Sequence, residues 1–260
     1  MPRHAPPFRP SWSALLLALL VLVLPGPAQA EEQPLVYQLL ANDRAIGSRR
    51  VTIKYLPTPT GEIRLLEAWT TFVLPIAKGT LRYEQRLGAR LGGDRSFASS
   101  MATNEHVREV QVHQAVDARW SVSTADTEGA KSWDLDPDAV DLVTPELFDP
   151  ERALSTLQGS TTMKLMSAET GGILAGSIEA LGPATLQIGA AEVEVQRYRF
   201  SPPEGVMTLA FSQDGWLVAY DYQVLGILVG ARLEKLPPPR TFGTALDAPI
   251  TTGTVSEETL

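Results

Sequence analysis

Short runs of apolar, β-branched and aromatic residues recur along most of the chain, and Gly, Pro, Asn and Asp separate them. Such runs predict β-strands. Because the connections between them are short, successive strands are expected to be antiparallel neighbours. The predicted strands cover residues 35–41, 45–56, 62–74, 79–91, 95–103, 106–115, 118–124, 161–168, 173–181, 184–188, 191–200, 205–213, 216–224 and 226–235.

A helical pattern occurs in one region, TPELFDPERALSTLQG at 144–159, where Asp149 is a candidate N-cap and Pro150 a candidate first residue. This region separates the two series of strands and is interpreted as a crossover between two meanders. The predicted fold is all-β, mainly an antiparallel meander, forming a curved open sheet or incomplete barrel with a short helical crossover. Residues 31–236 are expected to form one domain, a size at which all-β domains are ordinary.

The stretch VMTLAFSQDGWLVAYDYQ at 206–223 predicts a hairpin around Asp214-Gly215. A type I′ turn there would make Asp214 a turn residue, not a catalytic one. It would also place the small or polar residues of the hairpin on a solvent-exposed face, and its large apolar residues on the opposite, buried face. The predicted apolar face consists of Met207, Leu209, Phe211, Trp216, Val218, Tyr220 and Tyr222.

The question of function depends on what covers this apolar face. The sheet can curl on itself, pack on a second sheet, or wrap around a ligand. Gly226 and Gly230 lie inside the strand that follows the hairpin. Glycines at such positions predict a bend or the close approach of another backbone, so the curvature is expected to be sharp there.

The N-terminus has the pattern of a secretory signal peptide. Arg3 and Arg9 precede an apolar run at 14–24, and the small residues Ala28 and Ala30 follow it. The run is shorter than the roughly 20 residues of a membrane-spanning helix. Cleavage after Ala30 and a periplasmic location are therefore expected, with an uncleaved anchor as the alternative. The tail at 237–260 begins with three prolines and has few core-forming residues, so it is predicted to be disordered.

Composition excludes several functions. The formal charge of -8 becomes about -10 once the signal peptide is removed, which gives no electrostatic footprint for nucleic acid. The chain has no cysteine, which excludes disulfides, thiolate metal sites, thiol nucleophiles and a lipid-modified N-terminal cysteine.

Metal binding is not expected. Asp134, Asp136 and Asp138 have the spacing of an EF-hand calcium loop, but Ala139 replaces the required glycine and Pro145 replaces the closing glutamate. The two histidines of the mature chain, at 106 and 113, have an odd spacing that places them on opposite faces of a strand. No cofactor is predicted either.

No catalytic residue can be assigned. The sequence contains no G-x-S-x-G nucleophile motif. Glu192 and Glu194 share a strand face, but they alternate with Val193 and Val195 in the ordinary pattern of a half-exposed strand. A non-enzymatic protein is expected, while a hydrolase whose catalytic residues come from distant segments stays an alternative.

The overall plan carries a resemblance. A signal peptide, an opening hairpin YQLLANDRAIGSRRVTIKY, a helical crossover and the closing hairpin LAFSQDGWLVAYDY are present in order. This plan resembles uncharacterised secreted bacterial proteins with a curved sheet similar to the lipoprotein carriers and outer-membrane receptors (LolA/LolB-like). The resemblance implies an acyl-binding concave face, with the hairpin residues above as its lining and a short helix as a lid. The lid residues would be Phe148, Leu154 and Leu157.

Two hypotheses follow. The first is a periplasmic protein that binds a hydrophobic small molecule or lipid in its curved sheet. The second is an accessory or scaffold protein of an envelope complex, in which the apolar face is only core and an edge strand or the tail meets a protein partner. An outer-membrane β-barrel is a third possibility, because alternating strands suit it too.

Overall fold

The computed structural model describes residues 31–58, 61–77, 79–224 and 227–238. These residues form one sheet of 15 strands, antiparallel except for the parallel pair β9 and β10. The predicted all-β fold with a short helical crossover is thereby confirmed. The predicted signal peptide at 1–30 and positions 239–260 of the predicted tail lie outside the described residues.

Most strands pair with their neighbours in sequence, so the sheet is a long meander. The strands are β1 (Glu31–Ala41), β2 (Arg44–Thr58), β3 (Gly61–Ile76), β4 (Gly79–Leu91), β5 (Ser96–Thr103), β6 (Val107–Gln114), β7 (Trp120–Asp126), β8 (Gly129–Leu135), β9 (Leu142–Val143), β10 (Thr162–Met166), β11 (Ile173–Ile188), β12 (Ala191–Ser201), β13 (Met207–Ser212), β14 (Leu217–Val224) and β15 (Ile227–Leu233).

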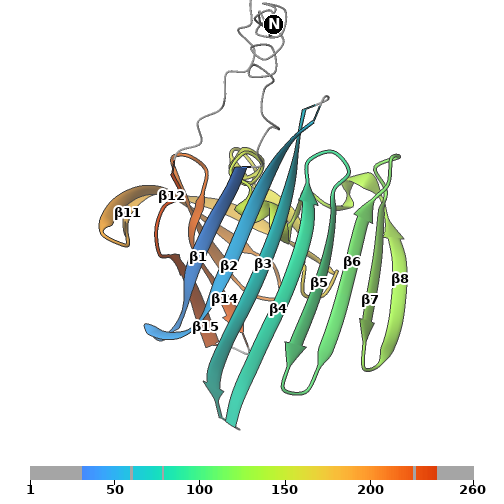
Figure 1. Ribbon diagram of the computed structural model, residues 1–260, viewed down its shortest axis with the longest axis horizontal. Coiled ribbons are helices and arrows are strands. Elements are labelled where there is room, and N and C mark those ends of the chain that lie inside the picture. Colours follow the sequence, from blue (N-terminus) through green and yellow to red (C-terminus); the bar gives the residue numbers. More distant parts are fainter. Residues whose placement is uncertain (1–30, 59–60, 78, 225–226, 239–260) are drawn as a thin grey trace, which may run out of the picture.

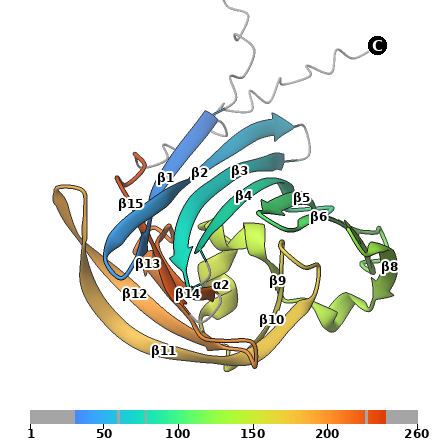
Figure 2. The same ribbon diagram turned by 90° about the horizontal axis from the view of Figure 1, so that it is seen from below.

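The first strand of the sheet pairs with the last. β1 lies between β2 and β15, with Tyr37 opposite Leu233. The sheet therefore has two arms, β2 to β8 and β15 to β9, which curl toward each other in Figure 2. Among the described residues the end strands β8 and β9 do not pair, so the barrel-like shape stays open.

The crossover lies between the two arms (Figures 1 and 2). It contains two 3-10 turns, η1 (Pro137–Ala139) and η2 (Thr144–Phe148), and one short helix, α2 (Ala153–Leu157). The helix begins after Arg152, so the predicted start at Pro150 is wrong. Asp149 instead ends η2, and its carboxylate accepts hydrogen bonds from Arg64 and the Glu151 backbone.

Two buried ion pairs attach the crossover to the first arm. Arg95 donates to both carboxylate oxygens of Glu146, at 2.8 and 2.6 Å, and Arg64 lies 2.9 Å from Asp149. Both carboxylate side chains are only 2% exposed. Glu146 also accepts the backbone N–H of Val143, which satisfies the carboxylate further. Because a buried charge without its partner is costly, these pairs hold the crossover inside the curl.

The hairpin turn differs from the predicted type I′. Gly215 N donates to Ser212 O, Ser212 N donates to Trp216 O, and only Gly215 adopts a positive φ, of 83°. These are the features of a three-residue loop with a type I turn and a bulge. The extra residue shifts the register, so Phe211 faces Leu217 and not Val218. The predicted pairs nearer the middle, such as Leu209 with Tyr220, are confirmed.

The prediction that one face of this hairpin is wet is also wrong. Ala210, Leu217 and Ala219 are buried as well as the large side chains. Ala210 lies opposite Arg197 and Ala219 opposite Arg232. Long arginine side chains cover apolar surface with their stems, which accounts for burial of the small residues between them.

Two strands of the structure were not predicted, and one continuous strand was predicted as two. β8 reads GAKSWDL, without regular alternation, because it is an exposed edge strand, and the two-residue β9 is too short to give a pattern. β11 is continuous from Ile173 to Ile188, although the sequence predicts two strands divided near Gly182. Gly182 has φ +80° and marks a register shift inside the strand, so its signal indicates a bulge and not a turn.

Gly215 gives a test of how tightly the hairpin packs on the crossover. A Cβ there would overlap the carbonyl oxygen of Pro150, whereas a Cβ at Gly182 would meet nothing within 4 Å; the two φ values, +83° and +80°, are nearly equal. Gly182→Ala should cost only the left-handed backbone strain, about 1–2 kcal/mol. Gly215→Ala should lower the free energy of unfolding further. Urea denaturation measures both, and equal losses would contradict this packing.

Candidate functional site

A cavity of about 400 Å³ lies between the inner face of the sheet and two loops, the β10–β11 loop at 167–172 and the β12–β13 loop at 202–206. Its wall is mostly apolar, with a few polar side chains. The lining residues are Arg49, Gln85, Thr144, Leu165, Ser167, Ala168, Glu169, Thr170, Gly172, Ile173, Leu174, Pro202, Glu204, Gly205, Val206, Met207, Tyr220 and Tyr222.

The residues predicted to bind a ligand divide into two groups. Met207, Tyr220 and Tyr222 line the cavity. The others do not line it: Leu209, Phe211, Trp216, Val218, Phe148 and Leu157 are buried, and Leu154 is partly buried against the same core. The inner face therefore forms a filled core around Phe211, whereas a cavity lies beside Tyr220.

The β10–β11 loop reaches across to the first arm of the sheet. Gly171, with φ +69°, lies so close to β6 and β7 that a Cβ would come within 2.9 Å of Val122 and 3.3 Å of Val110. The loop is also braced internally, because Ser167 N donates to Gly172 O and Gly171 N donates to Ser167 O. One wall of the cavity is therefore fixed between the two arms.

Arg49 is the polar centre of the cavity. It lies on the inner face of β2 because it alternates with Val51 and Ile53, which are buried there. Its guanidinium donates from Nε to Thr70 Oγ1 at 2.7 Å, from Nη1 to Tyr220 Oη at 2.7 Å, and from Nη2 to Gln85 Oε1 at 3.3 Å. One side chain thereby connects strands β2, β3, β4 and β14.

Aromatic rings surround the guanidinium. The Arg49 Cζ atom lies 5.7 Å from the ring centroids of both Phe148 and Tyr220, within the range of cation–π attraction. Tyr37 packs edge-on against both rings, and its hydroxyl donates to Leu217 O. Tyr222 stacks on Tyr220 with centroids 5.9 Å apart. These rings hold Arg49 in one orientation at the edge of the cavity.

Glu169, one of the acidic side chains of the cavity wall, is held by a tyrosine. Tyr83 stacks on Phe72 at 4.6 Å and donates from its hydroxyl to Glu169 Oε1 at 2.9 Å. Glu169 interacts electrostatically with Arg49, yet no ion pair within 4.0 Å joins them among the described residues. The cavity wall therefore carries one cationic group, Arg49, and two acidic ones, Glu169 and Glu204.

The tyrosines of this site keep their protons at neutral pH. Burial raises the pKa of Tyr83 well above its ordinary value, and the nearby charge of Glu169 raises it further. Burial also raises the pKa of Tyr220 and of Tyr222, although Arg49 acts in the opposite direction on both. All three hydroxyls are therefore hydrogen-bond donors under physiological conditions.

These pKa shifts predict a loss of stability at alkaline pH. An unfolded tyrosine releases its proton near its ordinary pKa of 10.0, whereas the folded state retains it. The free energy of unfolding should therefore fall as pH rises above about 10. Tyr222→Phe should show a smaller fall between about pH 9 and 11, measured by urea denaturation. Equal slopes for the variant and wild type would contradict the assignment.

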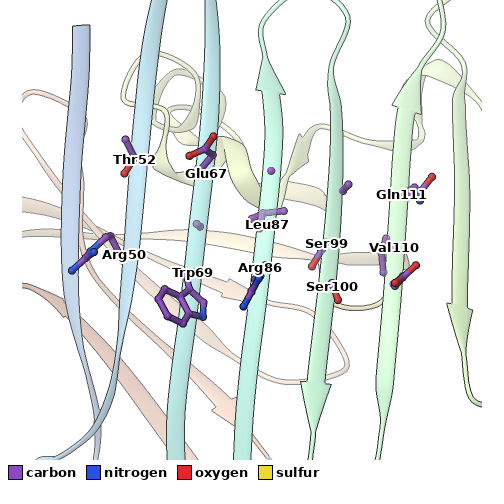
Figure 3. Close-up of a pocket in the computed structure, with 14 residues that line it drawn as sticks. Arg50, Thr52, Glu67, Trp69, Arg86, Leu87, Ser99, Ser100, Val110 and Gln111 are labelled. Atoms are coloured by element: carbon purple, nitrogen blue, oxygen red, sulfur yellow. The ribbon is translucent and has the colours of Figure 1, made fainter. Parts of the chain in front are cut away.

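A second hollow, of about 770 Å³, lies on the outer face of β2 to β6. Figure 3 shows Arg50, Trp69 and Arg86 in a row across three neighbouring strands. Trp69 is 51% exposed, and the Arg86 guanidinium lies 5.8 Å from its ring centroid while also pairing with Glu84. This surface is more open than the inner cavity, and its Arg86 is already paired, so it is the weaker candidate site.

The sequence reasoning missed Arg49, Tyr83 and Glu169. A signal for Arg49 was present: an arginine occupies the position where the alternation of β2 demands an inner, apolar residue. Such a charge on a covered face indicates a functional or strongly paired group. Tyr83 and Glu169 are 86 positions apart, so only the curl of the sheet brings them together.

Within the described residues, no three His, Asp or Glu side chains are grouped as metal ligands. The described part of the chain also contains no helix with the length and apolar character needed to cross a membrane.

The sequence matches no protein-family model and no curated protein. In structure, the chain is similar to a beta-barrel-like protein of a domain of unknown function, DUF1849, from Brucella abortus. The two share 11% sequence identity with a TM-score of 0.57, over 78% of this chain and 95% of that one. This likeness supports a curved all-β fold and shows no link to lipoprotein carriers or receptors.

Proposed function

We propose that this chain is a secreted periplasmic protein, without enzymatic activity, that binds a hydrophobic or lipid-like molecule in the inner cavity. The observation that supports the proposal most directly is the cavity itself, which lies against Tyr220 and Tyr222 on the inner face. Its volume of about 400 Å³ lies within the range of small-molecule sites, about 300–1,000 Å³.

The lining suits an apolar ligand with a small polar end. Leu165, Ile173, Leu174 and Met207 supply aliphatic surface from three strands, and Tyr222 supplies an aromatic wall. Ligand sites of this kind are mainly hydrophobic, with a few polar groups that fix orientation. Among the polar lining groups, Gln85 and Tyr220 are joined to Arg49 by hydrogen bonds, and Ser167, Glu169, Thr170 and Glu204 come from the two loops.

The resemblance to lipoprotein carriers and receptors agrees with this proposal, because a concave apolar sheet is the acyl-binding element in those folds. The crossover, however, buries Phe148 and Leu157 in the core. We therefore place the ligand between the β10–β11 and β12–β13 loops, and assign no lid role to the helix.

Binding can be tested with phenylnaphthylamine, a neutral fluorophore that brightens in apolar surroundings. We expect saturable binding by the purified full chain. Met207→Trp should reduce the affinity at least about tenfold, because the larger ring occupies the cavity. Val73→Trp places the same ring at an exposed position, 49% accessible, and should leave binding unchanged. Equal binding by both variants, or none by wild type, would refute a ligand site here.

Location is tested separately by N-terminal sequencing of the protein recovered from the periplasmic fraction. The mature chain should begin at Glu31, because Ala28 and Ala30 form the predicted cleavage signal. A chain that retains its first residues and sediments with membranes would indicate an uncleaved anchor instead.

A further inference from the structure

Arg49 has hydrogen-bonding capacity that the described structure does not use. A guanidinium carries five N–H donors. Three of them point to Thr70, Tyr220 and Gln85, so one N–H remains on each terminal nitrogen. Tyr220 Oη accepts from Arg49, and its own proton has no acceptor among the described residues, like that of Tyr222. These donors belong to side chains that line the cavity.

The surroundings of the Arg49 charge also differ from those of two other enclosed arginines, Arg64 and Arg95. Arg64 and Arg95, with side chains 16% and 12% exposed, each have a carboxylate within 3.0 Å. The three acceptors of Arg49 are neutral, and no carboxylate lies within 4.0 Å of it among the described residues. An enclosed cation without a counterion gains strongly from a nearby anion, because little solvent screens the pair.

Two carboxylates, Glu169 and Glu204, line the cavity, but neither forms an ion pair with Arg49 within 4.0 Å among the described residues. Tyr83 holds Glu169, the one that interacts electrostatically with Arg49. Its hydroxyl donates to Glu169 Oε1 at 2.9 Å, and its ring is fixed by stacking on Phe72. The β10–β11 loop that carries Glu169 is itself braced through Ser167, whose Oγ accepts the backbone N–H of Glu169. Glu169 thus lines the cavity without forming an ion pair with Arg49 within 4.0 Å.

We infer that the ligand is an amphipathic acid whose single anionic group binds Arg49, with the hydroxyls of Tyr220 and Tyr222 as further donors. The apolar part then lies along Leu165, Ile173 and Met207. This inference rests on the proposed function and adds the chemical class of the ligand. A guanidinium suits a carboxylate because its N–H groups form charge-assisted hydrogen bonds with both oxygens.

The test compares dodecanoic acid with dodecanol, which have the same chain length and differ in the head group. Each is titrated against the full-length mature chain loaded with phenylnaphthylamine. We expect the acid to displace the fluorophore at least about tenfold more effectively than the alcohol, since hydrogen bonds to charged groups are the stronger kind. Arg49→Met should abolish this preference and retain binding of the alcohol, whereas Arg49→Lys should keep part of it.

Glu169→Gln supplies a readout that does not depend on removing the arginine. It replaces a negative charge beside the cavity with a neutral group of equal size, so the acid should bind more tightly and the alcohol as before. Thermal unfolding checks that each variant is folded. If Arg49→Met is not folded, the preference for acid over alcohol in Glu169→Gln and Arg49→Lys tests the inference.

The outcomes separate the two proposals. Equal displacement by acid and alcohol in wild type, with no change in Glu169→Gln, would overturn the inference while leaving hydrophobic binding intact. Failure of the chain to bind phenylnaphthylamine at all would instead overturn the proposed function.

Discussion

The structure depends on covering one apolar face of a sheet that does not close. A closed barrel would bury its inner face by pairing its end strands, but β8 and β9 do not pair among the described residues. The crossover supplies the missing cover, and the ion pairs Arg95–Glu146 and Arg64–Asp149 fix it in place. Each pair joins the crossover to the first arm of the sheet, so the crossover stays packed against the inner face.

The crossover covers part of the inner face, and the cavity lies beside the part that it does not cover. Phe148 and Leu157 are buried in the same core cluster as Phe211. Beyond Phe148 the inner face is bounded by Arg49, Tyr220 and the two loops. Arg49 thus lies where the filled core meets the cavity. Aromatic rings pack against its guanidinium, but no carboxylate pairs with its charge within 4.0 Å among the described residues.

The sequence predicted the meander, the crossover and most strands because these depend on local alternation and on turn residues. It also identified three residues of the cavity wall, Met207, Tyr220 and Tyr222, from the hairpin pattern. It failed where the outcome depends on distant contacts. The bulge at Gly215 is one case, since a Cβ there would overlap Pro150 of the crossover. The separation of core from cavity is another, because it depends on how far the crossover extends.

The pairing of β1 with β15 has a consequence for how the chain folds. Tyr37 lies opposite Leu233, and Glu234 N donates to Val36 O, so the central seam of the sheet joins residues separated by nearly the whole described chain. Until β15 is available, β1 presents an unpaired edge, and the second arm has no strand to attach to the first. Such non-local pairing makes folding slow, since the loop must close before its contacts stabilise it. The joining of β1 and β15 also completes the wall that carries both Arg49 and Tyr220.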